Sequence, residues 1–103
     1  MSNKTSTDTR QLRAIGHKLK PVVTVAGNGL SDSVLAEIDA ALSRHELIKV
    51  KLAVGDRALK AAVAGELCAR TGAEAIQSIG NMLLILRRAE TPDPRLSNLI
   101  RPL

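Results

Sequence analysis

The sequence predicts a single α/β domain of the α+β-like type, with the element order α-β-α-β-α-β-β and a mixed four-stranded sheet on which helices pack. The chain has 103 residues, 45% of them hydrophobic, which suits one domain with one modest core. Short β-branched or alternating runs alternate with segments whose apolar residues recur at helical spacing. A Gly-Asn pair between the last two apolar runs predicts a closing hairpin.

The expected elements follow one another with short connections. They are a helix over 9–17, a strand over 22–25, a helix over 32–44, a strand over 47–54, a helix over 57–71, and strands over 75–79 and 82–86. Residues 1–8 are polar, and we expect them to be disordered. Gly16 marks the end of the first helix. Because Pro21 disfavours helix in the residue before it, the β-branched run after it is predicted to be a buried strand.

The second strand and the helices on either side of it carry the clearest patterns. Ser31 and Asp56 can each cap the helix that follows, and apolar residues recur along one side of both helices. The run between these helices alternates, so Lys49 and Lys51 are expected to point away from the core face. This strand therefore has one apolar face and one face that is at least partly wet.

The last part of the chain is predicted to be a hairpin followed by a tail. Gly72 is expected to end the third helix. Strands joined through helices tend to be parallel with right-handed crossovers, whereas the two strands of the hairpin must be antiparallel. The folded domain then spans residues 9–90, and residues 91–103, which contain three prolines, are expected to form an extended tail.

Charge and composition restrict the function. Fifteen Lys and Arg against ten Asp and Glu give a net charge of +5, which favours an anionic partner. No apolar run is long enough to cross a membrane, and the polar N-terminus does not resemble a secretory signal peptide. The chain has no Phe, Tyr or Trp to stack single-stranded bases, so shape-selective binding to structured RNA fits better. A single cysteine excludes an internal disulfide, and a reducing cytoplasm is the expected location.

A catalytic or metal site is not expected. Cys68 lies beside the apolar stripe of a helix, where a cysteine is usually a small core residue, so pairing with His17 or His45 as nucleophile and base is a weaker alternative. Two histidines and one cysteine make an incomplete zinc set. The carboxylates are scattered along the chain. We therefore expect no enzyme activity, no cofactor, no metal and no small-molecule substrate.

The basic residues gather in three places: before the first strand, on one face of the second strand, and after the last strand. A glycine turn between the first strand and the second helix, with two lysines upstream, offers free amides that can bind phosphate, although the same sequence also suits an ordinary tight turn. Each cluster alone is compatible with a solvated surface, and only the fold decides whether they merge. The candidate RNA contacts are Arg13, Lys18, Lys20, Gly27, Asn28, Gly29, Lys49, Lys51, Arg87 and Arg88.

Several segments recur together in a colinear series: KPVV at 20–23, NGL at 28–30, VLAEI at 34–38, HELIKVK at 45–51, TGA at 71–73 and IG at 79–80. This series resembles the CRM family, the chloroplast RNA splicing and ribosome maturation domain, and within it the single-domain bacterial members of the YhbY type. The resemblance covers roughly Arg10 to Arg88, nearly the whole expected domain.

The resemblance implies a fold similar to the C-terminal domain of translation initiation factor three, and it implies RNA binding. For a bacterial member it implies association with ribosomal RNA in precursors of the large ribosomal subunit. The family carries a G-x-x-G loop, which here reads Ala26-Gly27-Asn28-Gly29, with alanine at the first position. Family members also often carry a tyrosine before the arginine that ends the last strand. Leu86 stands in that place, so ring stacking there is lost.

Two hypotheses from different classes stay open beside the weaker enzyme alternative. In the first, the chain is an RNA-binding protein that docks on structured ribosomal RNA. In the second, it is a basic protein-interaction module that meets an acidic protein partner.

Overall fold

The computed structural model describes residues 2–27 and 29–102. Within these residues, three helices and four strands follow the predicted order. They are α1 (Ser2–Gly16), β1 (Pro21–Val25), α2 (Asp32–His45), β2 (Leu47–Leu52), α3 (Arg57–Thr71), β3 (Glu74–Ile79) and β4 (Met82–Leu86).

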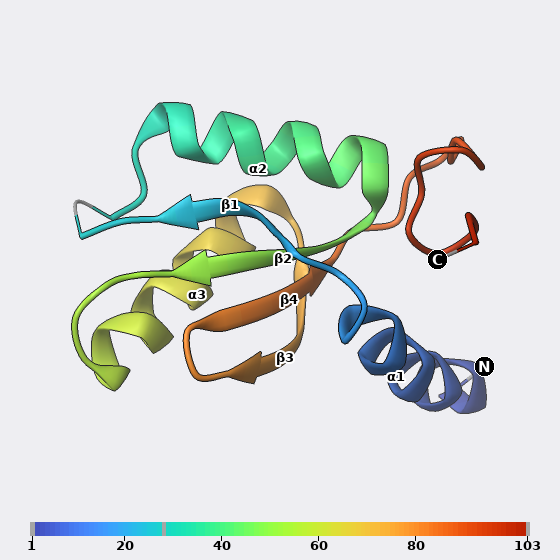
Figure 1. Cartoon of the computed structure of the whole chain (residues 1–103), viewed down its shortest axis with the longest axis horizontal. Coiled ribbons are helices and arrows are strands. Elements are labelled where there is room, and N and C mark those ends of the chain that lie inside the picture. Colours follow the sequence, from blue (N-terminus) through green and yellow to red (C-terminus); the bar gives the residue numbers. More distant parts are fainter. Residues whose placement is uncertain (1, 28, 103) are drawn as a thin grey trace.

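The four strands form one mixed sheet in the order β1-β2-β4-β3 (Figure 1). β1 and β2 are parallel and are connected through α2, whereas β4 pairs antiparallel with both β2 and β3. The predicted mixed sheet and hairpin are therefore confirmed. β4 lies inside the sheet, which explains why Leu83, Leu84, Ile85 and Leu86 are all buried.

The two faces of the sheet are covered differently. α2 and α3 pack on one face, over a main core to which β1, β2 and β4 contribute alternate residues. α1 covers one end of the other face, where Leu12 packs with Leu47, Leu84 and Leu86. We call the rest of this second face the open face. It carries Thr24, Lys49, Lys51, Gln77, Ile79 and Met82.

The first helix is longer than predicted. It begins at Ser2, whereas residues 1–8 were expected to be disordered and the helix to begin at Thr9. Polarity alone does not stop a helix, and the stretch from 2 to 8 contains neither Gly nor Pro to interrupt one. The helix ends at Gly16, where the expected stop lies.

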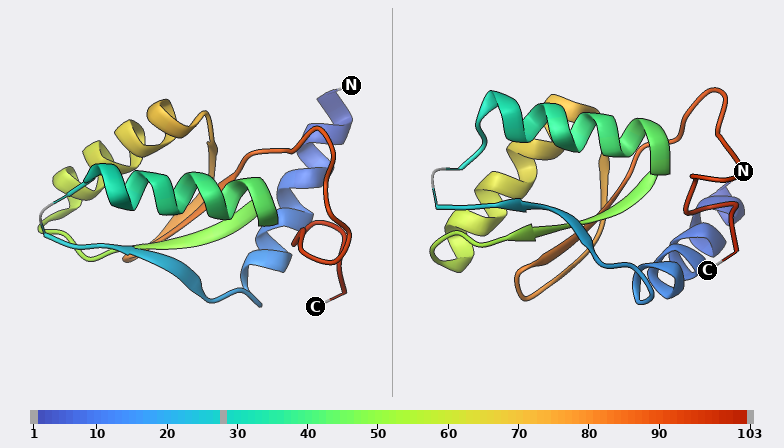
Figure 2. Two further views of the ribbon diagram at one scale, coloured as in Figure 1. Left: turned by 90° about the horizontal axis from the view of Figure 1, so that it is seen from above. Right: turned by 45° about the horizontal axis from the view of Figure 1, so that its top comes forward.

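The C-terminal segment also differs from the expected extended tail, because it folds back on the domain. Ser97 and Asn98 are buried, and the Asn98 Nδ2 donates a hydrogen bond to the Leu47 carbonyl at 2.7 Å. Leu99 packs against the smaller core under α1. Figure 2 shows this segment lying at the same end of the molecule as α1. Short helical turns form between the prolines, where the Ser97 amide donates to the Asp93 carbonyl. The side chains of Ser97 and Asn98 hold the segment against Glu46 and the start of β2.

A buried acidic residue makes the junction between α2 and β2. Glu46 has φ of 63°, which is unusual for a residue other than glycine. Its amide donates to the Leu42 carbonyl at 2.9 Å, and its own carbonyl accepts from the Arg87 amide at 2.8 Å. Its carboxylate accepts from the Ser97 hydroxyl at 2.7 Å and from the Ala89 amide at 2.5 Å. The junction therefore joins α2, β2, the end of β4 and the C-terminal segment.

The close approach of α1 to the sheet generates a stability prediction. A Cβ at Gly16 would lie 2.6 Å from Cδ2 of the buried Leu84. We expect Gly16→Ala to lower the free energy of unfolding by about 1–3 kcal/mol, because overpacking forces α1 or Leu84 to move. Urea unfolding measures this change. Gly65→Ala is the control: its Cβ meets open space on α3, and alanine should raise stability by up to about 1 kcal/mol. An unchanged or raised stability of Gly16→Ala would contradict the tight contact.

Candidate nucleic-acid interface

Two lysines stand in the middle of the open face. Lys49 and Lys51 are half-buried and alternate along β2 with fully buried core residues. The predicted alternation of this strand is confirmed. Within the described part of the chain, neither lysine has a carboxylate within ion-pair distance. Their charges therefore face solvent without compensation.

The lysines before β1 join this cluster. Lys18 and Lys20 follow the end of α1, and with Lys49 they line one hollow of about 320 Å³. The strand register explains the proximity, because Pro21 pairs with Lys49 across β1 and β2. The structure thus brings together basic residues that lie about thirty positions apart. Arg13 is exposed on α1 and is not among the residues that line this hollow.

The glycine turn lies at the other end of β1, so the five residues of this strand separate it from Lys18 and Lys20. Gly29 has φ of 84° and donates its amide to the Ala26 carbonyl at 2.9 Å, so this tight turn favours glycine. A Cβ at Gly27 would meet nothing within 4 Å. Asn28 lies outside the described residues. Packing within the chain therefore does not require glycine at position 27.

Arg87 lies apart from the open-face lysines. Its Nη1 donates to the Asp39 carboxylate at 2.6 Å and to the Thr71 carbonyl at 2.8 Å. Its Nη2 donates to the Asp39 carbonyl at 2.9 Å and to the Ser43 hydroxyl at 3.0 Å. Arg87 thus ties the end of β4 to α2 and α3, and four hydrogen bonds occupy its guanidinium. Arg88, the next residue, is exposed.

The sequence analysis missed one basic residue at this site. Arg101 and Asn98, from the C-terminal segment, line the same hollow as Lys18, Lys20 and Lys49. Arg101 escaped notice because the segment that carries it was expected to be extended. The apolar residues Leu96, Leu99 and Ile100 of this segment were a usable indication of packing, although only Leu99 joins the smaller core and the other two are exposed.

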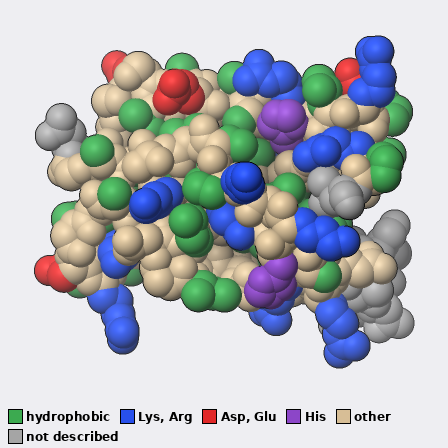
Figure 3. Space-filling model, in the orientation of Figure 1, with side chains coloured by type: hydrophobic (Ala, Val, Ile, Leu, Met, Phe, Trp, Pro, Cys, Tyr) green, Lys and Arg blue, Asp and Glu red, His purple; other side chains and the backbone are tan. Residues whose placement is uncertain are grey.

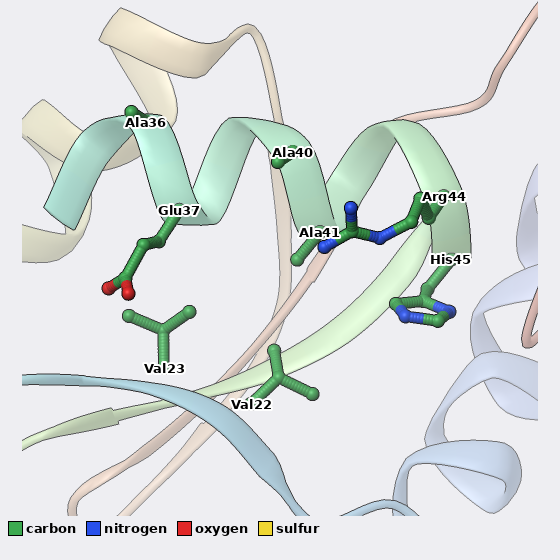
Figure 4. Close-up of a pocket in the computed structure, with 8 residues that line it drawn as sticks. All are labelled: Val22, Val23, Ala36, Glu37, Ala40, Ala41, Arg44 and His45. Atoms are coloured by element: carbon green, nitrogen blue, oxygen red, sulfur yellow. The ribbon is translucent and has the colours of Figure 1, made fainter. Parts of the chain in front are cut away.

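A second hollow, of about 380 Å³, lies between α2 and β1 (Figure 4). Small side chains of α2 form one wall, and Glu37 and Arg44 project from the same helix, so this hollow carries both signs of charge. His45 borders both hollows, and its Nδ1 donates to the Leu96 carbonyl at 2.8 Å. The mixed charge makes this hollow less suited to a polyanion than the one lined by lysines.

A surface view shows how charge is distributed over one face of the molecule. Figure 3 shows Lys and Arg side chains spread over the viewed face, with both histidines among them and the visible acidic side chains toward its edges. A face of this kind attracts polyanions, since the summed field of its charges extends beyond each single residue.

The geometry gives little support to a catalytic Cys68 or to a metal site. Cys68 packs against the main core, and burial raises the pKa of its thiol, which disfavours the nucleophilic thiolate. The described residues contain no group of three or more His, Cys, Asp or Glu side chains that could hold a metal ion. None of the helices in the described ranges has the length and apolar character needed to span a membrane.

Comparisons with known proteins agree on one family. The probable RNA-binding protein PA4753 of Pseudomonas aeruginosa is 48% identical over 97 residues, covering 94% of this chain and 93% of that protein. An RNA-binding protein of Haemophilus influenzae is 45% identical over 86 residues, covering 82% of this chain and 87% of that protein. The solution structure of the hypothetical protein SAV1595 from Staphylococcus aureus matches with a TM-score of 0.73 at 30% identity, covering 81% of this chain and 86% of that one. Because the family model of the CRS1/YhbY (CRM) domain matches residues 5–87, this chain belongs to the CRM family.

Proposed function

We propose that this chain binds RNA through its open face and through the hollow lined by Lys18, Lys20 and Lys49, which we call the basic hollow. One observation carries the proposal: Lys18, Lys20 and Lys49 converge without a carboxylate partner in the described part of the chain. Membership of a family whose matched relatives are named as RNA-binding proteins supports RNA as the polyanion. Lysine ammonium groups neutralise phosphates, and this gives affinity without reading sequence.

The composition of the open face favours structured RNA. The chain has no Phe, Tyr or Trp, the side chains on which readers of single strands usually stack splayed bases. A helix or fold of RNA instead presents phosphates at fixed spacing to the lysines. Gly27 leaves open space in which a sugar-phosphate chain can approach the backbone. We propose that Asn28 and Gly29 of the same loop also contact the RNA. Arg13 and Arg88 are flanking contacts, whereas Arg87 acts inside the protein.

We further propose that the RNA is ribosomal RNA in precursors of the large subunit, bound in the cytoplasm during ribosome assembly. It rests on the resemblance to bacterial single-domain members of the family. RNA binding of this kind involves no reacting groups, and we propose no enzyme activity. The rival is a basic surface that meets an acidic protein. The exposed Ile79 on the open face is the feature that favours this rival.

Removing both open-face lysines tests RNA binding. We expect the Lys49→Ala, Lys51→Ala double variant to bind a structured ribosomal RNA fragment more weakly, and similarly so across RNA sequences. The slope of log affinity against log salt should fall by about two units, one for each lost phosphate contact. Fluorescence anisotropy across a salt series measures both quantities.

The matched control removes the same charge from the opposite side of the molecule. Arg57 and Lys60 lie on α3, which packs on the other face of the sheet, and we expect the Arg57→Ala, Lys60→Ala double variant to bind like the parent. Parent-like affinity and slope in the Lys49→Ala, Lys51→Ala variant would refute the proposed interface. So would an equal loss in both double variants.

Gradient sedimentation of a cell lysate tests the ribosomal part. We expect the protein to migrate with the large subunit or its precursors at low salt, and to leave these fractions after ribonuclease treatment or at moderate salt. A protein found only at the top of the gradient at low salt would contradict the ribosomal assignment. A complex with an acidic protein that survives ribonuclease would favour the rival.

A further inference from the structure

The basic hollow is built from parts of the chain that lie far apart in sequence. It is lined by the stretch from Lys18 to Lys20, by Lys49 of β2, and by Asn98 and Arg101 of the C-terminal segment. Figure 2 shows this segment and the end of α1 at the same end of the molecule. Residues 98 and 101 fall outside the stretch from 5 to 87 that the family model matches.

Basic side chains dominate this hollow. Lys18, Lys20, Lys49 and Arg101 line it, and no acidic side chain of the described residues does. By contrast, Arg70 and Arg87 lie 3.2 and 2.6 Å from carboxylates, and Arg95 lies 3.6 Å from one. Four like charges around one concave site repel one another and raise the local concentration of anions. An anion bound there relieves that repulsion.

Arg101 is held in position rather than left to move freely. Its Nε donates to the Asn98 Oδ1 at 2.8 Å. Asn98 is itself fixed, because its Nδ2 donates to the Leu47 carbonyl at 2.7 Å and its amide donates to the His45 carbonyl at 2.9 Å. Among the described residues, only the Nε of this guanidinium is engaged in a hydrogen bond. Its two terminal nitrogens form a planar fork that matches phosphate oxygens.

The other hollows fit a phosphate less well. The hollow between α2 and β1 contains Glu37 as well as Arg44, and the carboxylate of Glu37 would repel a phosphate. The one between α3 and the β3–β4 hairpin has two basic residues, Arg57 and Lys60, both on α3, and the hairpin lines it with the uncharged Ser78 and Gly80. The basic hollow therefore has more basic residues than these two, and it alone among the three contains a described cation, Arg101, that a buried asparagine holds.

We propose that the C-terminal segment completes a phosphate site, in which Arg101, positioned by Asn98, binds one backbone phosphate of the RNA together with Lys20 and Lys49. This inference rests on the proposed function and deepens it, because it assigns an RNA contact to the segment after the family domain. The volume of about 320 Å³ is well above the roughly 30 Å³ that one water occupies, so the site accommodates a hydrated phosphate.

The test compares two arginines of the same segment. Arg101→Ala should lower the salt slope by about one unit and weaken binding of the structured RNA fragment about eightfold at about 0.1 M salt. Arg95→Ala is the matched control, since Arg95 is exposed, pairs with Asp93 and does not line the hollow, and we expect it to bind like the parent. Urea unfolding of both variants checks that the fold is retained.

The outcomes separate this inference from the proposed function. If the parent does not bind the RNA, the proposed function fails. If the parent binds and the Lys49→Ala, Lys51→Ala variant binds weakly, but Arg101→Ala matches the parent, this inference alone is overturned. An equal loss in Arg95→Ala also overturns it, because the effect would then report total charge.

A second measurement does not depend on any variant. In a nuclear magnetic resonance titration of the parent, the amide signals of Leu19 and Asn98 should shift when the RNA fragment is added. The absence of these shifts overturns the inference. Shifts with inorganic phosphate that RNA does not reproduce would assign the hollow to a free anion, and would overturn it too.

Discussion

The buried junction at Glu46 is the constraint on which the arrangement of the rest depends. Its positive φ turns the chain from the end of α2 into β2, and its carboxylate bonds to Ser97 and to the amide of Ala89. A buried carboxylate without such donors costs several kcal/mol, so the segments that supply them are held where they are. One residue thereby sets the start of the strand at Leu47 and the position of the C-terminal segment.

Because β2 begins at Leu47, its alternate residues point to different faces of the sheet, and these two faces have different roles. Ile48 and Val50 point into the main core under α2 and α3, so Lys49 and Lys51 must point to the open face. α2 and α3 pack over the main core on one side, and α1 covers the other side only at one end. Stability thus comes mainly from one face and the end under α1, which leaves the remaining surface available for a partner. With no Phe, Tyr or Trp in the chain, that surface offers mainly charge and shape.

The local patterns in the sequence were enough to predict the strands, the helices after β1 and the direction of the open-face lysines. Alternation along LIKVKL and the Gly-Asn link each act over a few residues, and such short-range rules hold regardless of the rest of the fold. Several boundaries shifted by one or two residues: β1 begins at Pro21, α2 ends at His45, β2 ends at Leu52 and β3 begins at Glu74. Val54 still contributes to the core as its alternation predicted.

The features that could not be predicted depend on contacts between distant residues. Arg87 was grouped with the other basic residues, but its role follows from Asp39 and Ser43, more than forty positions away. Asn98 and Leu47 lie 51 positions apart, so their hydrogen bond is invisible to any local pattern. Without it, Arg101 belongs to a proline-containing tail. With it, Arg101 stands beside Lys20 and Lys49.

The most direct measurement of the central claim, that RNA docks on the open face, is a titration of the nitrogen-15-labelled chain with a structured ribosomal RNA fragment, followed through its backbone amide signals. The account predicts that the signals of Thr24, Lys49 and Lys51 shift, while those of Ala61 and Ala69 on α3 stay in place. Shifts confined to α3, with unchanged signals along β1 and β2, would contradict it.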